Sequence, residues 1–167
     1  MVENIADKSL TARRDEKWMQ VALREARIAL KKKEVPVGAI VVYQGKIIGR
    51  GHNQTESLND PTAHAEILAI GAAANYLNSW RLPEADLYVT LEPCSMCAGA
   101  IVLSRIKKLI FGAYDPKNGA CGSLYNLVQD KRFNHQVELV SEILKDECTE
   151  LLQAFFKELR EGKDEPE

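Results

Sequence analysis

The sequence predicts an α/β fold in which helices cover both faces of a single sheet. Short segments rich in β-forming residues alternate with longer segments of helical periodicity, and no internal repeat or long linker divides the 167 residues. A hydrophobic content of 46% and a charged content of 28% are ordinary for a globular domain. We expect one domain over residues 13–160, preceded by a flexible arm (1–12) and followed by a disordered charged tail (161–167).

The first predicted helix covers about residues 14–33. Its apolar residues recur at intervals of three and four with charged residues between them, which is the pattern of a helix with one buried face. These residues are Met19, Ala22, Leu23, Ala26, Ala29 and Leu30. Pro36 and Gly38 end the helix, because both residue types disfavour helical backbone.

A β-hairpin is predicted next. Residues 39–43 and 46–48 are dense in β-branched residues and are joined by the two-residue turn Gln44-Gly45. A polar loop then leads to a second helix over about residues 63–76. Because that helix is rich in alanine and apolar on several sides, we expect it to be buried.

The rest of the chain continues the alternation of strands and helices. Strands are predicted at residues 87–91, 109–111 and 137–140, and helices at about 93–104 and 146–160. Pro93 can open the first of these helices, because proline suits the first helical position. The final helix is amphipathic, so we expect one of its faces to pack against the sheet.

Composition limits the partners and the compartment. The net charge is −2 and the pI is near 6.0, so charge gives no argument for a nucleic-acid partner, although basic residues cluster locally. The longest apolar stretches are far shorter than the roughly 20 residues of a membrane span. The first 14 residues lack the apolar centre of a secretory signal. We therefore expect a cytoplasmic protein with no membrane partner.

Two short segments carry metal-ligand chemistry: HAE at residues 64–66 and PCSMC at 93–97. An imidazole and two thiols suit zinc, and a catalytic zinc site leaves its fourth position to water. Cys94 and Cys97 share one face of a helical first turn, where the helix dipole lowers thiol pKa values. We expect His64, Cys94 and Cys97 to bind one Zn²⁺ ion, with zinc preferred over iron on ligand type. Cys121 and Cys148 are expected to be free thiols.

Glu66 determines the predicted reaction class. It lies two residues after His64, so its carboxylate can reach the open zinc position without occupying it. Bound zinc lowers the pKa of water to roughly 7, and Glu66 can pass the proton of that water to a ring nitrogen and a leaving amine. This chemistry is hydrolytic deamination of an amidine-like carbon. The alternative is that Glu66 is an ordinary acid in the first turn of a helix.

Further segments carry a resemblance that extends beyond the metal motif. They are VPVGA (35–39), DPTAHAE (60–66), YVTLEPCSMCAGAI (88–101), SRI (104–106), FGA (111–113) and GACGS (119–123). In these segments the chain resembles the bacterial tRNA-specific adenosine deaminases of the cytidine deaminase-like superfamily. The combination of HxE with PCxxC is also the mark of the zinc nucleobase deaminases in general. The resemblance covers roughly residues 14–160.

The resemblance implies both an activity and a fold. The activity is zinc-dependent conversion of adenosine to inosine at the wobble position of a tRNA anticodon, usually that of the arginine tRNA. The fold is a three-layer α/β/α sandwich with a central five-stranded mixed sheet. The enzyme is expected to be a homodimer that holds one zinc ion per chain and binds the anticodon stem-loop, whose unpaired bases are the easiest to extrude.

The resemblance also assigns substrate contacts. Asn53 would hydrogen-bond the purine, and Val37 would form the apolar wall of the base pocket. The backbone at Ala65 and Pro93 would touch the base and the attacking water. Asp115 would contact the RNA strand, and Phe156 would help to shape the RNA groove. From the residues alone, other roles remain open. Asn53 can simply turn the loop, Val37 can be hairpin core, and Asp115 can start a turn before proline.

Two other functions are compatible with parts of the pattern. Deaminases of free guanine, cytosine or a nucleotide such as dCMP share the metal motif, although the segments around Asp60 and Gly119 argue against them. A zinc-stabilised RNA-binding subunit without activity would be expected to lack the proton shuttle, so the presence of Glu66 argues against it.

Overall fold

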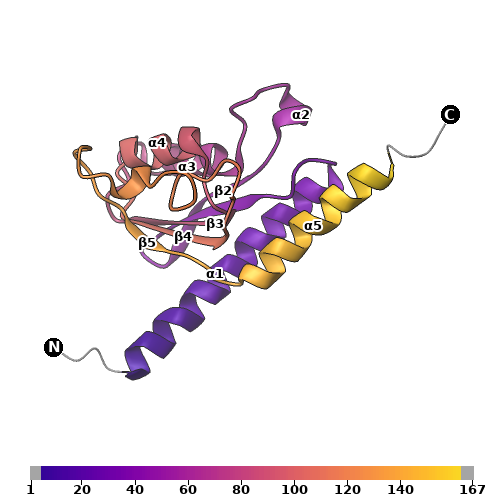
Figure 1. Cartoon of the computed structure of the whole chain (residues 1–167). Coiled ribbons are helices and arrows are strands. Elements are labelled where there is room, and N and C mark those ends of the chain that lie inside the picture. Colours follow the sequence, from indigo (N-terminus) through magenta and orange to yellow (C-terminus); the bar gives the residue numbers. More distant parts are fainter. Residues whose placement is uncertain (1–4, 163–167) are drawn as a thin grey trace.

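The structure is a computed structural model that describes residues 5–162, and it consists of helices on both faces of one five-stranded sheet (Figure 1). The strand order is β2-β1-β3-β4-β5. The strands are β1 (Gly38–Tyr43), β2 (Lys46–His52), β3 (Ala85–Leu91), β4 (Lys108–Ala113) and β5 (Glu138–Val140). β1 is antiparallel to β2 and β3, whereas β3, β4 and β5 are parallel to one another. The predicted α/β/α sandwich with a mixed five-stranded sheet is confirmed.

Two pairs of helices form the outer layers (Figure 1). One face of the sheet is covered by α1 (Ile5–Lys31) and α5 (Lys145–Glu161), and the other by α3 (Ala65–Leu77) and α4 (Ser95–Leu103). Two short helices, α2 (Thr55–Leu58) and η1 (Leu127–Gln129), lie in connecting segments. No helix within residues 5–162 combines the length and the apolar character needed to cross a membrane.

The strands divide their side chains between two cores. In β1, Ile40 and Val42 belong to the core under α1 and α5, whereas Ala39 and Val41 belong to the core under α3 and α4. Successive side chains of a strand point to opposite faces, so a strand covered on both faces is apolar at most positions. This double burial explains why the strand segments read as continuous apolar runs.

Glycine in β2 allows α3 to lie close to the sheet. A Cβ atom on Gly51 would collide with the backbone carbonyl of Ala65, and one on Gly49 would collide with that of Ala69. Glycine is therefore required where the strand and helix backbones approach so closely. The same approach holds the N-terminal end of α3, where His64 lies, against the end of β2.

The first helix is longer than the sequence analysis predicted. It begins at Ile5, so residues 5–12 of the predicted arm are helical. Residues 8–12 are exposed or only partly buried, and Leu10 is 63% exposed, so these turns carry no apolar periodicity that would mark them as helical. The remainder of the predicted arm (1–4) and most of the predicted tail (163–167) lie outside the described residues.

The predicted start of the fourth helix was also wrong. Helix α4 begins at Ser95, and Cys94 is its N-cap with an extended backbone (φ −72°, ψ 176°), so Pro93 lies before the cap. The physical reason is an isolated antiparallel bridge between Cys94 and Gly119, which keeps Cys94 in extended geometry. The four-residue helix α2 was missed because one short polar turn carries no periodicity.

Candidate active site

Three metal-ligand side chains meet at the N-terminal ends of two helices. His64 is the N-cap of α3, Cys94 is the N-cap of α4, and Cys97 lies within the first turn of α4. The Sγ atoms of both cysteines lie 3.6 Å from Nδ1 of His64, and one donor atom from each of the three residues lies within 4.8 Å of the others. One imidazole nitrogen and two sulfur atoms fit a tetrahedral zinc ion with one position left for a non-protein ligand.

Hydrogen bonds within this group already favour a thiolate. A hydrogen bond from Cys97 outweighs desolvation and, together with one from His64, lowers the pKa of Cys94 to about 4. The same hydrogen bond, together with burial, raises the pKa of Cys97. Because ligands must be deprotonated to bind a cation, metal binding here releases protons and is favoured as pH rises.

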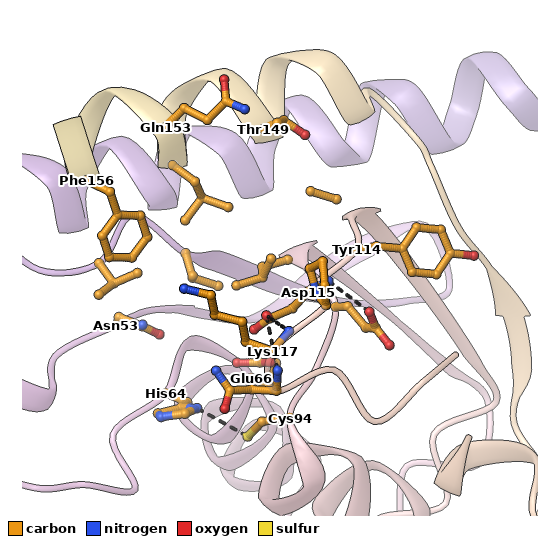
Figure 2. A pocket seen from close by; sticks show the side chains of 18 of the residues that line it. Asn53, His64, Glu66, Cys94, Tyr114, Asp115, Lys117, Thr149, Gln153 and Phe156 are labelled. Carbon is orange, nitrogen blue, oxygen red and sulfur yellow. Dashed lines mark hydrogen bonds between the residues drawn. The ribbon is translucent and has the colours of Figure 1, made fainter. Parts of the chain in front are cut away.

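Glu66 lies in the first turn of α3, beside the three ligands. It is buried, with 4% of its surface exposed, and burial raises the pKa of its carboxyl to about 7. Figure 2 shows Glu66 together with His64 and Cys94 on one side of a cavity, and all three line it. The carboxyl is therefore close to the ligand group and faces the space that a substrate would enter.

The cavity has a volume of about 1200 Å³. Helix α5 forms the wall opposite the ligands, where Thr149, Gln153 and Phe156 line the cavity (Figure 2). Three cations, Lys117, Lys157 and Arg160, also line it. Sites for small organic ligands commonly measure about 300–1000 Å³, so this cavity has room for more than a single base.

Comparison with known proteins assigns the family. The model of the MafB19-like deaminases matches residues 13–160. The chain is 55% identical to the tRNA-specific adenosine deaminase of Bacillus subtilis (strain 168) over 149 residues, which cover 89% of this chain and 92% of that one. It is 52% identical to the tRNA-specific adenosine deaminase of Aquifex aeolicus (strain VF5), with 87% and 95% covered. The chain belongs to the tRNA-specific adenosine deaminase family.

A solved structure supports the same assignment for the fold. It comes from biochemical and structural studies of A-to-I editing by tRNA deaminases at the wobble position of transfer RNA, and it superposes with a TM-score of 0.79 at 47% identity. The superposition covers 81% of this chain and 99% of the other. The chain is therefore a deaminase with the cytidine deaminase-like fold that the sequence predicted.

In this deaminase, Asn53 is held in one orientation. Its Oδ1 atom accepts a hydrogen bond of 2.9 Å from the backbone N–H of Ala65. The backbone N–H of Asn53 donates to the backbone carbonyl of Val37 at 3.1 Å. The Nδ2 group makes no hydrogen bond to any other residue within 5–162. Asn53 is one of the residues that line the cavity, so its amide has a donor available to a ligand.

The other predicted substrate residues divide into two groups. Val37, Asp115 and Phe156 line the cavity, and their contact with a substrate stays a prediction. Ala65 and Pro93 are buried and are not among its lining residues. The predicted turn at Asp115 also forms, because its Oδ1 accepts hydrogen bonds from the N–H groups of the second and third residues after it.

Sequence reasoning missed the role of Glu92, which precedes Pro93 and is 2% exposed. Its Oε1 accepts hydrogen bonds from the N–H groups of Cys121 (3.1 Å) and Ser123 (2.8 Å), and its Oε2 accepts from the N–H of Asp115 (2.9 Å) and the hydroxyl of Ser123. Glu92 thus ties the loop after β4 to the segment that carries the cysteines. An acid at the end of an apolar strand is the signal, since a buried carboxylate needs partners.

Proposed function

We propose that this enzyme deaminates adenosine to inosine at the wobble position of a tRNA anticodon, with the arginine tRNA as its expected substrate. The observation that carries the proposal is the meeting of His64, Cys94, Cys97 and the buried Glu66 on one side of a large cavity. The relatives named above support the reaction and the class of substrate.

In this proposal His64, Cys94 and Cys97 hold one zinc ion. The two sulfurs and one imidazole nitrogen are the ligand set of the zinc deaminases, and the distances among them support a single ion. When bound, zinc lowers the pKa of a coordinated water enough to make it a nucleophile near neutral pH. The protein contributes the ligands and the group that moves the protons.

Glu66 is the proposed proton carrier. Its carboxyl lines the cavity beside the ligands but is not one of the three ligand side chains. It is therefore free to take a proton from the attacking water and to deliver protons to the purine ring and to the departing ammonia. These transfers balance the reaction, in which water adds to the carbon that bears the amine and ammonia leaves.

The remaining substrate contacts follow the cavity. We propose that Asn53 Nδ2 donates to an acceptor nitrogen of the purine, that Val37 packs against the ring, and that Asp115 and Phe156 contact the flanking RNA. The backbone at Ala65 and Pro93 stays in the proposal as a contact to the base and the water, although neither residue is among those that line the cavity.

The size and charge of the cavity favour RNA over a free base. Lys117, Lys157 and Arg160 are cations that can neutralise phosphates, and a free guanine or cytosine has none. Helix α5 also contributes Phe156, an aromatic side chain on which an unpaired base can stack. These features favour the anticodon loop over a free base, whereas a nucleotide, which also carries a phosphate, is tested by the assay below.

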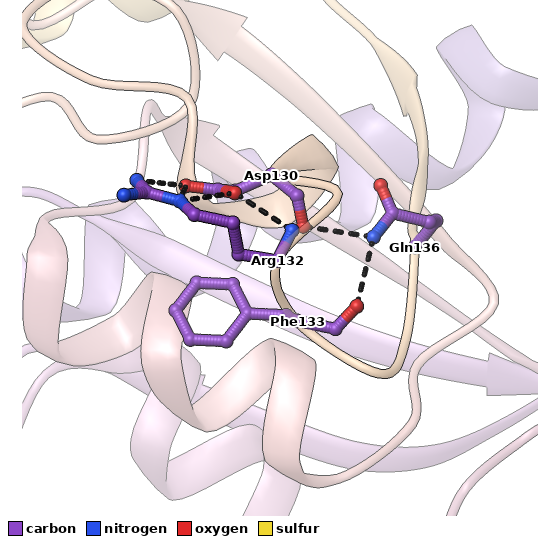
Figure 3. Close-up of polar contacts among 4 residues, drawn as sticks. All are labelled: Asp130, Arg132, Phe133 and Gln136. Atoms are coloured by element: carbon purple, nitrogen blue, oxygen red, sulfur yellow. Dashed lines mark hydrogen bonds and ion pairs between the residues drawn. The ribbon is translucent and has the colours of Figure 1, made fainter.

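We also propose a homodimer that works in the cytoplasm, where its tRNA substrate is used. Four large apolar side chains are exposed near the end of α4 and in the segment after β4: Leu103, Leu124, Tyr125 and Phe133. Hydrogen bonds join Arg132 and Gln136 to Asp130, and the ring of Phe133 takes no part in them (Figure 3). A contiguous exposed apolar patch marks an interaction site, and we propose that these four side chains form the dimer contact.

The dimer has its own test. Sedimentation equilibrium should give twice the 18.7 kDa mass of the chain for the wild type and a shift toward monomer for Phe133→Ser. Trp80→Ser removes another exposed aromatic ring, and this variant should still sediment with the mass of a dimer, as the wild type does. A monomeric wild-type protein would contradict the proposed dimer.

The function is tested on an anticodon stem-loop that carries a wobble adenosine. Purified wild-type protein should hold about one zinc ion per chain and convert that one adenosine to inosine, read by sequencing. Glu66→Gln should keep the zinc and lose about 10²–10⁴-fold in turnover, the usual contribution of a general acid–base. Stem-loops of other tRNAs test the preference for the arginine tRNA. Full zinc content with activity only on free bases or nucleotides would overturn the proposal.

A further inference from the structure

A second buried carboxylate, that of Glu34, lies outside the group just described. Glu34 follows the end of α1 and is 1% exposed. Its Oε1 accepts hydrogen bonds of 2.6 Å from both the N–H and the hydroxyl of Ser57. Its Oε2 accepts from the N–H of Glu56 at 3.2 Å and the hydroxyl of Thr55 at 3.3 Å. All four donors belong to α2, which is distant in the chain.

Helix α2 has few other anchors. None of its residues is buried, and Gln54, its own N-cap, makes no side-chain capping hydrogen bond. The first N–H groups of a helix have no partner inside it and need an acceptor from elsewhere. Here the carboxylate of Glu34 supplies that acceptor, and a negative charge at this end of a helix is also favoured by the helix dipole.

The segment that Glu34 holds connects two parts of the active site. Residues 54–63 join Asn53 to His64, and a backbone hydrogen bond from Gln54 to Ala63 (3.0 Å) closes the base of the segment. Thr55 lines the cavity on this segment. Val35, the residue that follows Glu34, lines the same cavity. Both partners of the contact between Glu34 and α2 are therefore next to the cavity.

We propose that Glu34 is a positioning residue: its carboxylate holds the segment 54–63 against the end of α1, so that Thr55 and Asn53 face the substrate. Glu34 itself does not line the cavity and acts only through α2. The expected effect of Glu34 on substrate binding rests on the proposed function, whereas its effect on the position of residues 54–63 does not. The inference therefore predicts that loss of the carboxylate weakens substrate binding more than turnover.

The test compares two buried acids. Glu34→Gln keeps the volume but presents an NH₂ group to donors that need an acceptor, so buried hydrogen bonds between the side chain and α2 are lost. Asp15→Asn is the control, because Asp15 is 2% exposed, accepts a hydrogen bond from the hydroxyl of Tyr88 (2.8 Å) and does not line the active-site cavity. Both variants should lose stability, and only Glu34→Gln should weaken substrate binding.

Hydrogen exchange measures the segment without any assay of activity. In Glu34→Gln the amides of Glu56 and Ser57 should exchange at least tenfold faster than in the wild type, and the amides of Asn53 and Gln54 should also lose protection. In Asp15→Asn all four should exchange as in the wild type. Wild-type protection of Asn53 and Gln54 in Glu34→Gln would overturn the inference, because the carboxylate would then be only a local cap.

Kinetics on the anticodon stem-loop measure the consequence for the substrate. Glu34→Gln should raise KM about tenfold and change kcat by less than threefold, with the zinc content unchanged. Equal losses of kcat in Glu34→Gln and Asp15→Asn, with KM unchanged in both, would overturn the positioning role. If the wild type did not deaminate the stem-loop, the proposed function would fail, and hydrogen exchange at Asn53 and Gln54 would still decide the role of Glu34.

Discussion

The backbone N–H of Ala65 donates a hydrogen bond of 2.9 Å to Oδ1 of Asn53. Ala65 lies between the proposed ligand His64 and the proposed proton carrier Glu66, so this bond joins the loop after β2 to the first turn of α3. It also fixes which end of the Asn53 amide is engaged. The acceptor end is used by the protein, and the donor end is available to a substrate in the cavity.

This orientation gives the first prediction. Asn53→Asp keeps the acceptor for Ala65 but removes the donor, so a purine nitrogen would face a carboxylate oxygen instead of an N–H group. We expect kcat/KM on the anticodon stem-loop to fall by roughly 10–100-fold, corresponding to about 1–3 kcal/mol for an unpaired buried polar group. The zinc content should not change. Asn78→Asp makes the same change at an exposed position, and activity within twofold of wild type in both variants would contradict the role of Asn53.

The second prediction concerns the metal. Cys97→Ala should reduce zinc from about one ion per chain to near zero and should lower Tm, because a bound metal stabilises the folded state by mass action. Cys121→Ala is the control, since both thiols are buried and only Cys97 lies in the ligand group. A chelator should lower the Tm of the wild type and of Cys121→Ala but not that of Cys97→Ala. Full zinc content in Cys97→Ala would remove that residue from the ligand set.

A third prediction follows from Glu92. Glu92→Gln leaves an NH₂ group facing backbone N–H groups, so we expect the free energy of unfolding to fall by about 2 kcal/mol. The loop after β4 should lose protection from hydrogen exchange at Cys121 and Ser123. The control is Glu84→Gln, because the side chain of Glu84 is 67% exposed in a surface ion pair. Chemical denaturation gives both values, and equal stability of the two variants would disprove the anchoring role of Glu92.

Stability at low pH should depend on Glu34. Burial raises the pKa of this carboxyl, but hydrogen bonds from Ser57, Glu56 and Thr55 outweigh burial and lower it from 4.5. A pKa that is lowered on folding adds stability above the unfolded value, and this stability is lost as pH falls through the folded value. The Tm difference between the wild type and Glu34→Gln should therefore be constant at neutral pH and shrink below about pH 4.5.

The control for this pH dependence is Glu56→Gln, an exposed neighbour whose side chain makes no hydrogen bond within residues 5–162. Its Tm should follow that of the wild type at every pH. A Tm difference between the wild type and Glu34→Gln that stayed constant down to pH 3 would show that the Glu34 carboxylate is not stabilised by folding.

Local patterns predicted much of the fold and brought together the three side chains that we propose as metal ligands. The strands are continuous β-forming runs because both of their faces are buried, and the ligands occupy short motifs whose chemistry is visible without a structure. Long-range contacts were not visible. The partners of Glu34 and Glu92 are mainly backbone N–H groups in distant loops, and a sequence carries no pattern for these. The face of α5 that lines the cavity depends on how the helix packs, so Thr149 and Gln153 were missed.

The two sides of the cavity come from separate stretches of the chain. The three proposed ligands and Glu66 lie within residues 64–97, whereas Thr149, Gln153 and Phe156 belong to the last helix. Substitutions in that helix can change what enters the cavity without moving a ligand or the acid. Reactivity and selectivity can therefore diverge independently, and exchanging the C-terminal helix between relatives is a direct route to altered substrate choice.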